Sequence, residues 1–469
     1  MPKHSVKHNA QFEIEEIKEL FYFNSSVNVS VSISCDSRTI DSSQIFLPLK
    51  GENFDGHDFI SEVLDKGIKH AFCERDKILK VKEEHKPKLI LVHDSLDAYH
   101  LIASYYRRKI NPKVIAITGS SGKTTVKDLV ASVLSTNFKV HKTEANFNNE
   151  IGVPKTILEM PEDTQFLVLE LAMRAKGEIK YLAKTAHPDV AVITSIGTAH
   201  IGRLGSKSEI IKTKCEILEN LKKDGLAILC NEPGLIKHAE NIWSGKTAVF
   251  APSDVKDVQF KNGSSAFTLC ASGIVNETYT VNALGNVQVL NSLLAILIAK
   301  YFGLSREDIQ EGLLHFENPQ GRGNIIKLKE DVFLIDESYN ANPDTVKVAV
   351  DNLVNCWSSD HKKVLVLGEL AELGEHTERL LGELSGWLIG KSLDNVITVG
   401  DKLGQIASGG GGNVKNAKNI QKCCAILKKL LVPKAVVLVK GSHVASLEKV
   451  IEHFYKEPCV VWKTKGING

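Results

Sequence analysis

Residues 117–127 read ITGSSGKTTVK, and this stretch sets the fold of the region around it. The residues before it, 114–118, form a short apolar and β-branched run, which is typical of a buried strand. After Thr125, apolar residues recur at helical spacing as far as Leu134. The glycines therefore lie where a strand turns into a helix, and the backbone N–H groups and dipole at a helix start favour an anion.

The composition of this turn indicates a phosphate-binding loop. Gly119 and Gly122 let the backbone approach phosphates closely. Lys123 has the length to contact the terminal phosphates of a nucleotide. Thr124 or Thr125 offers a hydroxyl to Mg²⁺.

The spacing of the loop departs from the general phosphate-loop motif. In G-x-x-x-x-G-K-[ST] the first glycine would fall at position 117, where this chain has Ile117. An ordinary Gly-Ser turn with a solvated lysine is the alternative. The strand and the helix on either side are what the motif requires, so we favour a phosphate site that includes Ser120 and Ser121.

The bulk composition is that of a globular protein. The chain has 469 residues, which is enough for about two to four domains, with a net charge of +2. This near-neutral balance argues against a nucleic-acid partner. The first residues contain no apolar signal core, and no run approaches the roughly 18 apolar residues of a membrane helix. Nine scattered cysteines without a C-x-x-C pair indicate reduced thiols, so we expect a cytoplasmic protein.

The chain separates into three blocks. Residues 1–112 mix short β-branched runs with helical stretches. Residues 113–320 alternate strands and helices, which predicts a mostly parallel sheet covered by helices. Residues 321–469 alternate again, which predicts a second domain of the same kind. The predicted fold class is therefore α/β with three domains.

Apolar runs predict the individual strands of these blocks. In the central block, residues 255–281 indicate short antiparallel strands and 290–301 a strongly apolar helix. In the third block, residues 409–412 are predicted to form a flexible loop tip. The other predicted strands are 27–33, 45–49 and 89–92 in the first block, 114–118, 166–171, 190–196 and 226–230 in the second, and 332–335, 364–367, 395–399 and 435–439 in the third.

A carboxylate and an imidazole beyond the loop suit a metal site, and a lysine follows them in the chain. Glu170 ends one predicted strand and His200 follows another, and in open α/β sheets ligands bind beyond the carboxyl ends of strands. Lys214 lies in a helical stretch that follows. Taken singly, each has a plainer explanation, because a lone histidine is more often structural and a helical lysine is usually a solvated charge. Their combination with a phosphate loop favours the metal interpretation.

Two further groups of polar residues stand beside predicted strands. DESYNANP (336–343) places an acidic and an aromatic residue at the end of a strand, which suits a site, although Asn-Ala-Asn-Pro is also an ordinary turn. CDSRT (35–39) and KGENFDGHDFI (50–60) are turn-forming, and Arg38 among hydroxyls suits a second phosphate-bearing ligand. A surface loop explains Arg38 equally well.

Taken together, these stretches resemble the Mur ligases, the ATP-dependent amino-acid ligases of peptidoglycan synthesis. The resemblance runs in order along nearly the whole chain, and the shortened TGSSGKTT loop is the form that this family uses. NFNNEIGVP (146–154), DESYNANP, LGELAELGE (367–375) and VLVKGS (437–442) are similar to the members that add D-alanyl-D-alanine to UDP-N-acetylmuramoyl-tripeptide. The resemblance implies ATP and Mg²⁺ as cofactors, an N-terminal UDP-binding domain, a central P-loop ATPase-type domain and a C-terminal Rossmann-like domain.

The resemblance also implies a role for each matching residue. Lys123 would bind the β- and γ-phosphates, and Lys214 matches a lysine that reacts with CO₂ to become a carboxylate-like metal ligand. Thr124, Glu170 and His200 would be the other magnesium ligands, and Lys123, Lys214 and His200 the catalytic set. The remaining residues are, for the nucleotide, Gly119, Ser120, Ser121, Gly122, Thr125, Asn291, Arg322, Asp336 and Tyr339, and, for the UDP-sugar and its peptide, Ser37, Arg38, Asp55, His57, Asn148 and Asn149.

The chain departs from the family pattern at several positions. Ser195 stands where the family often has Asn, and His443 where an arginine often follows Lys-Gly-Ser. These departures concern adenine and dipeptide recognition and leave the phosphate and metal residues intact. The others are Ala172, Arg174, Asn286, Val287, Gln288 and Leu381.

Other functions are compatible with parts of the sequence. A folylpolyglutamate synthase-like or another Mur-type ligase would use a different amino acid, although the DSR and DGH segments argue against the folate version. A nucleotide-dependent switch or transport ATPase would hydrolyse ATP without an acceptor, and a catalytically degraded paralogue would only bind. The sequence leaves open whether the tripeptide ends in meso-diaminopimelate or lysine, and we expect a monomer.

Overall fold

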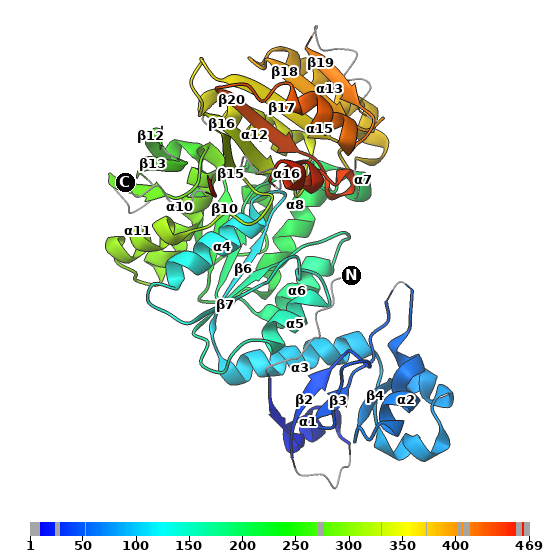
Figure 1. The fold of residues 1–469 in the computed structure, drawn as a ribbon. Helices are drawn as coiled ribbons and strands as arrows, with labels where there is room; N and C mark the ends of the chain where they lie inside the picture. Colours follow the sequence, from blue (N-terminus) through cyan, green and yellow to red (C-terminus); the bar gives the residue numbers. More distant parts are fainter. Residues whose placement is uncertain are drawn as a thin grey trace. The chain divides into compact units, whose positions relative to one another are not determined.

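The computed structural model describes residues 10–23, 29–51, 53–261, 263–270, 276–329, 331–371, 373–401, 403, 406, 413–455 and 462–463. Figure 1 shows the elements in chain order. The contacts divide the chain into two compact units. The first is Met1–Ala116, Phe138–Met173 and Glu178–Asp189, and the second is Ile117–Asn137, Arg174–Gly177 and Val190–Gly469. The predicted loop tip at 409–412 lies outside the described residues.

The N-terminal part of the first unit is built on a sheet. Its elements are β1 (Phe12–Glu13), α1 (Ile14–Phe21), β2 (Ser30–Ser34), β3 (Gln44–Phe46), α2 (Ile60–Asp65), β4 (Ala71–Glu74), β5 (Leu89–Val92) and α3 (Ser95–Ile110). The strand order is β1-β2-β3-β4-β5, with β1 antiparallel to β2 and the other pairs parallel. Apolar residues of β3 and β4 form a buried cluster with Ile60, Val63 and Leu64 of α2.

A six-stranded sheet carries the phosphate loop. Its elements are β6 (Lys113–Thr118), α4 (Lys123–Leu134), β7 (Val140–Lys142), α5 (Gly152–Leu158), β8 (Phe166–Glu170), α6 (Glu178–Ala186), β9 (Val190–Ile193), α7 (Ile201–Leu204), α8 (Lys207–Cys215), β10 (Leu226–Cys230), α9 (Pro233–Glu240) and β11 (Lys246–Phe250). The strand order is β11-β10-β9-β6-β8-β7. β8 and β9 are buried along their whole length, as expected of parallel strands covered on both faces.

A small antiparallel sheet follows in the chain and confirms the expectation for residues 255–281. It consists of β12 (Val255–Lys261), β13 (Ser264–Leu269) and β14 (Glu277–Val281), with β13 in the middle. The predicted apolar helix is α10 (Asn286–Tyr301), which packs against α4, and α11 (Arg306–His315) also contacts α4. Because α4 has neighbours on several sides, nearly all its side chains are buried.

The C-terminal block is a seven-stranded sheet. Its elements are β15 (Asn324–Lys329), β16 (Val332–Glu337), α12 (Pro343–Asn355), β17 (Lys362–Gly368), α13 (Thr377–Ile389), β18 (Asn395–Val399), β19 (Val414–Ala417), α15 (Ile420–Lys428), β20 (Ala435–Lys440), α16 (Glu448–Tyr455) and β21 (Trp462–Lys463). The order is β19-β18-β17-β20-β16-β15-β21. β15 is antiparallel to its neighbours and the pairs from β16 to β19 are parallel.

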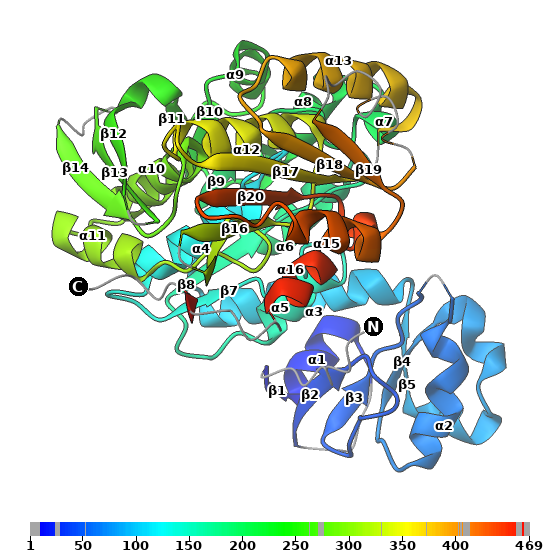
Figure 2. The same cartoon turned by 45° about the horizontal axis from the view of Figure 1, so that its top comes forward.

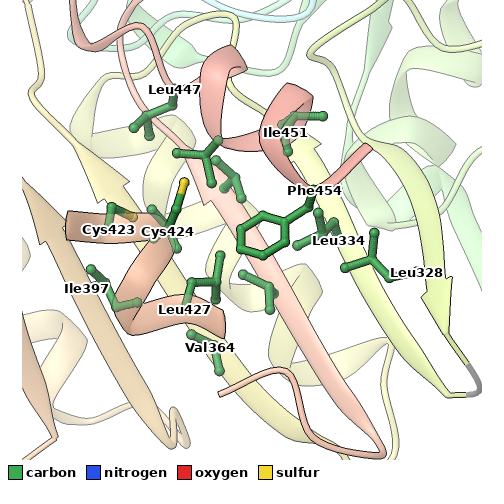
Figure 3. Packing of buried hydrophobic residues seen from close by; sticks show 14 of the residues in the cluster. Leu328, Leu334, Val364, Ile397, Cys423, Cys424, Leu427, Leu447, Ile451 and Phe454 are labelled. Carbon is green, nitrogen blue, oxygen red and sulfur yellow. The ribbon is translucent and has the colours of Figure 1, made fainter. Parts of the chain in front are cut away.

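Helices cover both faces of this sheet. Figure 2 shows α12 and α13 on one face and α15 and α16 on the other. The second face is an apolar core, in which Leu427 and Phe454 lie over Val364 and Leu334 (Figure 3). Burial of each such side chain contributes about 1.5–3 kcal/mol. This core fixes the strands, so the loops at their carboxyl ends have a rigid support.

These observations confirm the predicted α/β fold class, whereas the domain bounds 1–112, 113–320 and 321–469 stay a prediction. Apolar strands such as β6, β8, β10, β17, β18 and β20 lie where the sequence predicts them. The short or polar strands β1, β7 and β19 carry too little apolar signal to be predicted. Across the described residues, no helix has the length and apolar composition that crossing a bilayer demands.

Candidate functional site

The phosphate loop joins β6 to α4 through two glycines in conformations that other residues disfavour. Gly119 has a φ of 155°, and Gly122, the residue before the helix, has a φ of 83°. A Cβ at Gly119 would lie 1.9 Å from Thr194 Oγ1, and one at Gly122 would lie 2.9 Å from Asn291 Oδ1. Both positions therefore require glycine. The first-turn N–H groups of α4 have no acceptor within the helix, so this turn fits a chain of phosphates.

Residues 194–198 follow β9 and form the brace of the phosphate loop, which they hold by hydrogen bonds. The backbone oxygen of Ser195 accepts the N–H of Ser120 at 2.9 Å, and Ser195 Oγ accepts the N–H of Ser121 at 2.9 Å. Thr194 Oγ1 donates to the backbone oxygen of Ser121, and Gly197 N–H donates to Ser120 Oγ at 2.9 Å. Thr194 is not among the predicted site residues, and Ser195 appears there only as a departure. Two hydroxyl residues at the end of a strand beside the loop are the signal that points to them.

Lys123 lies over the loop that it is predicted to serve. Its Nζ donates to the backbone oxygen of Gly119 at 2.9 Å, which holds the ammonium group across the turn. Thr124 and Thr125 follow in the first turn of α4 and are 8% and 4% exposed. The structure thus brings the predicted glycines, the lysine and the hydroxyl residues together in one turn.

Lys214 is a buried lysine on α8, with 1% of its surface exposed. Burial and the nearby charge of Lys123 lower the pKa of Lys214 well below its usual value. A neutral amine is nucleophilic, which is what reaction with CO₂ requires. His200 precedes α7 in a left-handed conformation with a φ of 65°, at the end of the segment that braces the phosphate loop.

Glu170 and the two predicted asparagines lie together in the first unit. Asn148 Nδ2 donates to Glu170 Oε1 at 2.8 Å, and Glu170, at the end of β8, is 2% exposed. The N–H of Glu170 donates to Thr143 Oγ1 at 3.0 Å. Asn149 Oδ1 accepts the N–H of Gly152 at 2.9 Å, which supports the start of α5. Asn148 therefore orients the carboxylate that is predicted to bind a metal, and Asn149 also has a structural use.

The predicted metal ligands fit Mg²⁺ by their chemistry. Thr124 offers a hydroxyl and Glu170 a carboxylate, and oxygen atoms are the ligands that Mg²⁺ prefers. His200 adds an imidazole, and a carbamylated Lys214 would add two further oxygens. Glu170 belongs to the first unit and the others to the second, so their assignment to one ion stays a prediction.

A different group of potential metal ligands lies in the first unit. Among the residues that the structure describes, Asp65, Glu84 and His85 have ligand atoms within 4.8 Å of one another. Lys82 Nζ lies 2.6 Å from Asp65 Oδ2, and His85 Nε2 lies 2.8 Å from Asp65 Oδ1. Ion pairs therefore account for this cluster, and it was not among the predicted sites.

Three predicted nucleotide residues form one cluster at the start of the C-terminal block. The Arg322 guanidinium lies 4.2 Å from the centre of the Tyr339 ring, a cation–π contact. The Tyr339 N–H donates to the backbone oxygen of Gly321 at 3.3 Å. Asp336 Oδ1 accepts the hydroxyl of Ser338 at 2.6 Å. Burial raises the pKa of Asp336 although its hydrogen bonds oppose the shift. Arg322 and Tyr339 thus offer a cationic and aromatic surface on a fixed turn.

Asn291, the predicted adenine contact, lies against the phosphate loop. It is 7% exposed, its Oδ1 lies beside Gly122, and its Nδ2 donates to Gln288 Oε1 at 3.2 Å. Gln288 is one of the departures from the family pattern, and it orients Asn291. The departure at Gln288 therefore replaces one hydrogen-bonding side chain by another that still supports the predicted site.

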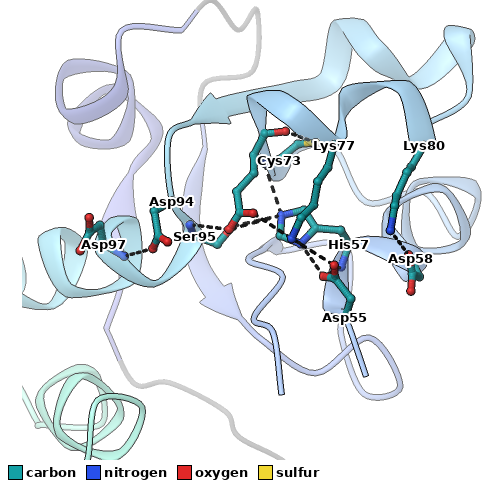
Figure 4. Close-up of polar contacts among 10 residues, drawn as sticks. Asp55, His57, Asp58, Cys73, Lys77, Lys80, Asp94, Ser95 and Asp97 are labelled. Carbon is teal, nitrogen blue, oxygen red and sulfur yellow. Dashed lines mark hydrogen bonds and ion pairs between the residues drawn. The ribbon is translucent and has the colours of Figure 1, made fainter. Parts of the chain in front are cut away.

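The turn predicted for the UDP-sugar is an internal polar cluster (Figure 4). The side chain of His57 is buried, with Nδ1 2.7 Å from Asp55 Oδ1 and Nε2 accepting the N–H of Glu74 at 3.3 Å. Lys77 Nζ lies 3.0 Å from Asp55 Oδ2 and 2.8 Å from Glu74 Oε2. Burial by itself would raise the pKa of Asp55, but hydrogen bonds from His57 and Lys77 outweigh it and lower the pKa. The contribution of His57 to a ligand site is therefore to shape this turn.

Arg38 and Ser37 follow β2 on the surface. The Arg38 side chain is 83% exposed, and its Nε and Nη2 each lie 2.8 Å from a carboxylate oxygen of Asp36. These hydrogen bonds lower the pKa of Asp36 despite its partial burial. An exposed guanidinium at the end of a strand is accessible to a phosphate, which is compatible with the predicted role. The binding of a ligand by Ser37 and Arg38 stays a prediction.

Comparisons with protein families cover most of the chain. Residues 31–117 match the Mur ligase family, catalytic domain, and residues 117–299 match the Mur ligase middle domain. Residues 321–443 match the Mur ligase, glutamate ligase domain. The UDP-N-acetylmuramoyl-tripeptide–D-alanyl-D-alanine ligase of Bacillus subtilis is 35% identical over 437 residues, which are 91% of this chain and 93% of that protein.

Solved structures show the same likeness. A crystal structure of MurF from Acinetobacter baumannii has a TM-score of 0.86 and 28% identity and covers 96% of this chain and 99% of its own. The MurF ligase of Thermotoga maritima in complex with ADP has a TM-score of 0.82 and 29% identity, covering 91% and 97%. A folylpolyglutamate synthase of Mycobacterium tuberculosis, with a TM-score of 0.63 and 17% identity over 77% of this chain and 95% of its own, shares the fold.

Proposed function

We propose that this chain, which belongs to the Mur ligase family, is an ATP-dependent ligase that joins D-alanyl-D-alanine to UDP-N-acetylmuramoyl-tripeptide. The observation that carries the proposal is the glycine-walled phosphate loop with Lys123 held across it. It occurs in a chain whose likeness to such ligases extends over 91% of its length. A phosphate loop alone would fit any nucleotide-dependent protein, and the flanking domains supply the substrate class.

The first chemical step makes the tripeptide carboxylate reactive. A carboxylate oxygen attacks the γ-phosphorus of ATP, the bond to the β-phosphate oxygen breaks, and ADP leaves with an acyl phosphate. The reacting groups are all anionic, so the protein must neutralise charge and align the attack. Lys123 serves the β- and γ-phosphates, and the N–H groups at the start of α4 hold them in place.

The second step forms the amide bond. The amine of D-alanyl-D-alanine attacks the acyl carbon, and inorganic phosphate leaves from the tetrahedral intermediate together with the loss of one amine proton. No protein nucleophile is needed, because phosphorylation has already supplied the leaving group. The residues that matter are therefore those that position three substrates and exclude water.

Mg²⁺ bound by Thr124, Glu170, His200 and a carbamylated Lys214 would neutralise charge on the triphosphate. Asn148 holds one oxygen of Glu170 at 2.8 Å and so fixes the orientation of that ligand. The buried amine of Lys214 forms a carbamate with CO₂ by N–C bond formation and loss of one proton. Its burial, at 1% exposure, supports this role over that of a solvated surface charge.

The outer domains would bind the other groups. In the C-terminal domain, Arg322, Asp336 and Tyr339 would contact the nucleotide, together with Asn291 of the middle domain. In the N-terminal domain, Ser37, Arg38 and the turn at Asp55 and His57 would hold the UDP-sugar. In the central domain, Asn148 and Asn149 would lie near the peptide. We propose that the enzyme acts as a monomer in the cytoplasm, where the eight described cysteines are free thiols.

Two alternative functions differ from this proposal in the amino acid or dipeptide that the enzyme uses as acceptor. A folylpolyglutamate synthase-like enzyme would use glutamate and a folate, and the likeness to that class shows the fold alone. A switch or transport ATPase would hydrolyse ATP in the absence of any amino acid. The third residue of the tripeptide, meso-diaminopimelate or lysine, requires both substrates to be assayed.

The test is phosphate release from ATP by the purified protein with the UDP-tripeptide and D-alanyl-D-alanine added singly and together. We expect release only when both are present, with a product that is heavier by one dipeptide residue in mass spectrometry. Release that is independent of the dipeptide would contradict the proposal and leave a nucleotide site with another acceptor.

A further inference from the structure

Asp344 lies in the first turn of α12 and is not among the predicted site residues, yet it forms hydrogen bonds to Thr198. Its Oδ2 accepts the N–H of Thr198 at 2.9 Å and the hydroxyl of Thr198 at 2.8 Å. Thr198 lies in the segment matched by the middle-domain family, whereas Asp344 lies in the segment matched by the glutamate ligase domain family. One carboxylate oxygen therefore joins the two domains through two charge-assisted hydrogen bonds.

The segment that Asp344 holds is the brace of the phosphate loop. Gly197, next to Thr198, donates its N–H to Ser120 Oγ at 2.9 Å, and a Cβ at Gly197 would lie 2.9 Å from Asp344 Oδ2. Ser195 binds the N–H of Ser120 in the same segment. Only two residues thus separate the carboxylate of the C-terminal domain from the phosphate loop.

Other close approaches join the same two domains. A Cβ at Gly374 would lie 3.0 Å from the Cα of Gly202, and one at Gly285 would lie 2.6 Å from Asn352 Nδ2. The glycines let the backbone of one domain approach the backbone or a side chain of the other closely. Van der Waals contact of this kind is not directional, whereas the hydrogen bonds of Asp344 require one relative orientation. Asp344 therefore fixes the docked position that the glycines permit.

We propose that Asp344 is a positioning residue that couples docking of the C-terminal domain to the geometry of the phosphate loop. The inference rests on the proposed function. In the docked state the carboxylate fixes Thr198 and, through Gly197 and Ser120, the loop. When the domain moves away, both donors of Thr198 lose their acceptor and the brace loosens. Phosphoryl transfer is then fast only when the C-terminal domain is docked, which limits loss of the acyl phosphate to water.

The test compares Asp344→Ala with a matched control on the same helix, Asp351→Ala. Asp351 Oδ1 pairs with Lys391 Nζ at 2.7 Å within the C-terminal domain. Asp344→Ala is expected to lower kcat for dipeptide-dependent phosphate release about 10- to 100-fold, because two hydrogen bonds to a charged acceptor are lost. The Kd for ADP should change less than kcat does, because the phosphate loop and Asn291 hold the nucleotide in either position of the domain and only the nucleotide contacts of the C-terminal domain depend on docking. The control should stay within about twofold of the parent.

Two further variants separate positioning from folding. Asp344→Asn keeps an acceptor for the Thr198 N–H and gains a donor for its hydroxyl, so it should restore most of the lost kcat. Gly197→Ala places a Cβ against the carboxylate and should also slow the reaction. In the Asp344→Ala background that Cβ has room, so the double variant should be no slower than Asp344→Ala alone. If Asp344 had a purely structural role, Asp344→Asn would not restore kcat, and the effects of Gly197→Ala and Asp344→Ala would add.

The outcomes separate this inference from the proposed ligase function. A kcat within twofold of the parent for Asp344→Ala, or equal losses in Asp344→Ala and Asp351→Ala, would overturn the inference. If Asp344→Ala does not fold, Asp344→Asn and Gly197→Ala carry the test. If the parent itself shows no dipeptide-dependent release, the function fails, and small-angle scattering still tests docking. A larger radius of gyration in Asp344→Ala than in the parent and the control supports it, and equal radii overturn it.

Discussion

The phosphate loop and the turn around His57 both follow strands and both contain polar residues with a predicted ligand role, yet they are built differently. In the phosphate loop, Lys123 Nζ donates to the backbone oxygen of Gly119 across the turn, and the glycines keep side chains out of the space beside the backbone. In the N-terminal turn, the side chains of Asp55, His57 and Lys77 bond to one another. The first arrangement keeps space beside the backbone at the start of α4, where a phosphate can bind, and the second satisfies its polar side chains among themselves.

This difference separates two uses of a polar motif. A group that serves a ligand must keep bonding capacity for it, so mutation should affect turnover more than stability. In a network whose polar side chains bond to one another, mutation removes bonds within the protein, so it should affect stability more than turnover. Variants of the phosphate loop should therefore lose more activity than variants of the turn around His57.

Lys123→Ala should lower kcat by about 10³-fold or more, because the charge that neutralises the β- and γ-phosphates is lost. The melting temperature should change little. Lys176→Ala is the control, since that side chain is 63% exposed and pairs with Glu209 on the surface. A Lys123→Ala variant with near-normal kcat would remove the phosphate loop from the reaction.

Gly119→Ala should weaken ADP binding by about 100-fold, because its Cβ would meet Thr194 Oγ1 at 1.9 Å and deform the loop. Gly177→Ala is the matched control: it also has a positive φ, 86°, but a Cβ there meets nothing within 4 Å. The control should lose only about 1 kcal/mol of stability from backbone strain and bind ADP normally. Equal ADP affinities of the two variants, measured by calorimetry, would show that the glycine cradle has no role.

His57→Ala should lower the free energy of unfolding by about 2–4 kcal/mol, because Asp55 and Lys77 lose the buried partner between them. With saturating substrates kcat should stay within about threefold of the parent, while KM for the UDP-substrate rises. His315→Ala, at an exposed histidine, is the control for urea unfolding. A large loss of kcat with unchanged unfolding would place His57 in the chemistry instead.

The smallest effect concerns pH. The pKa of Asp55 is lowered in the folded state, so its contribution to stability is present above the unfolded pKa of about 3.9 and is lost as pH falls through that value towards the folded pKa. The parent should therefore exceed Asp55→Asn in unfolding free energy by a constant amount above about pH 5, and the difference should shrink as pH falls towards about 3. A difference that grows in acid would contradict the network of Asp55, His57 and Lys77.

The sequence predicts the apolar core of this molecule better than its braces. Apolar, β-branched runs predict β6, β8 and β20, because burial dictates their composition. Short edge strands such as β7 have no such run and are not predictable in this way. The phosphate loop is predictable because its conformation admits only glycine at Gly119 and Gly122, and this requirement appears in the sequence as a recognisable motif.

Contacts between distant segments were not predictable. Thr194 and Asp344 belong to no recognisable motif in the sequence. Only the fold brings them to the phosphate loop and its brace. The burial of His57 was equally hidden, because a His in a polar turn gives no sign of which way its ring points. Residue type predicts what a group can do, and the tertiary structure decides whether it has a partner.

If the phosphate loop drives amide formation through an acyl phosphate, oxygen must pass from the tripeptide carboxylate to the released phosphate, and an isotope label follows that transfer. The UDP-tripeptide is prepared with ¹⁸O in both oxygens of the carboxylate that reacts, and the released phosphate is analysed by mass spectrometry. We expect one ¹⁸O atom in each phosphate, because the attacking carboxylate oxygen leaves with phosphorus. Product formed together with unlabelled phosphate would contradict it.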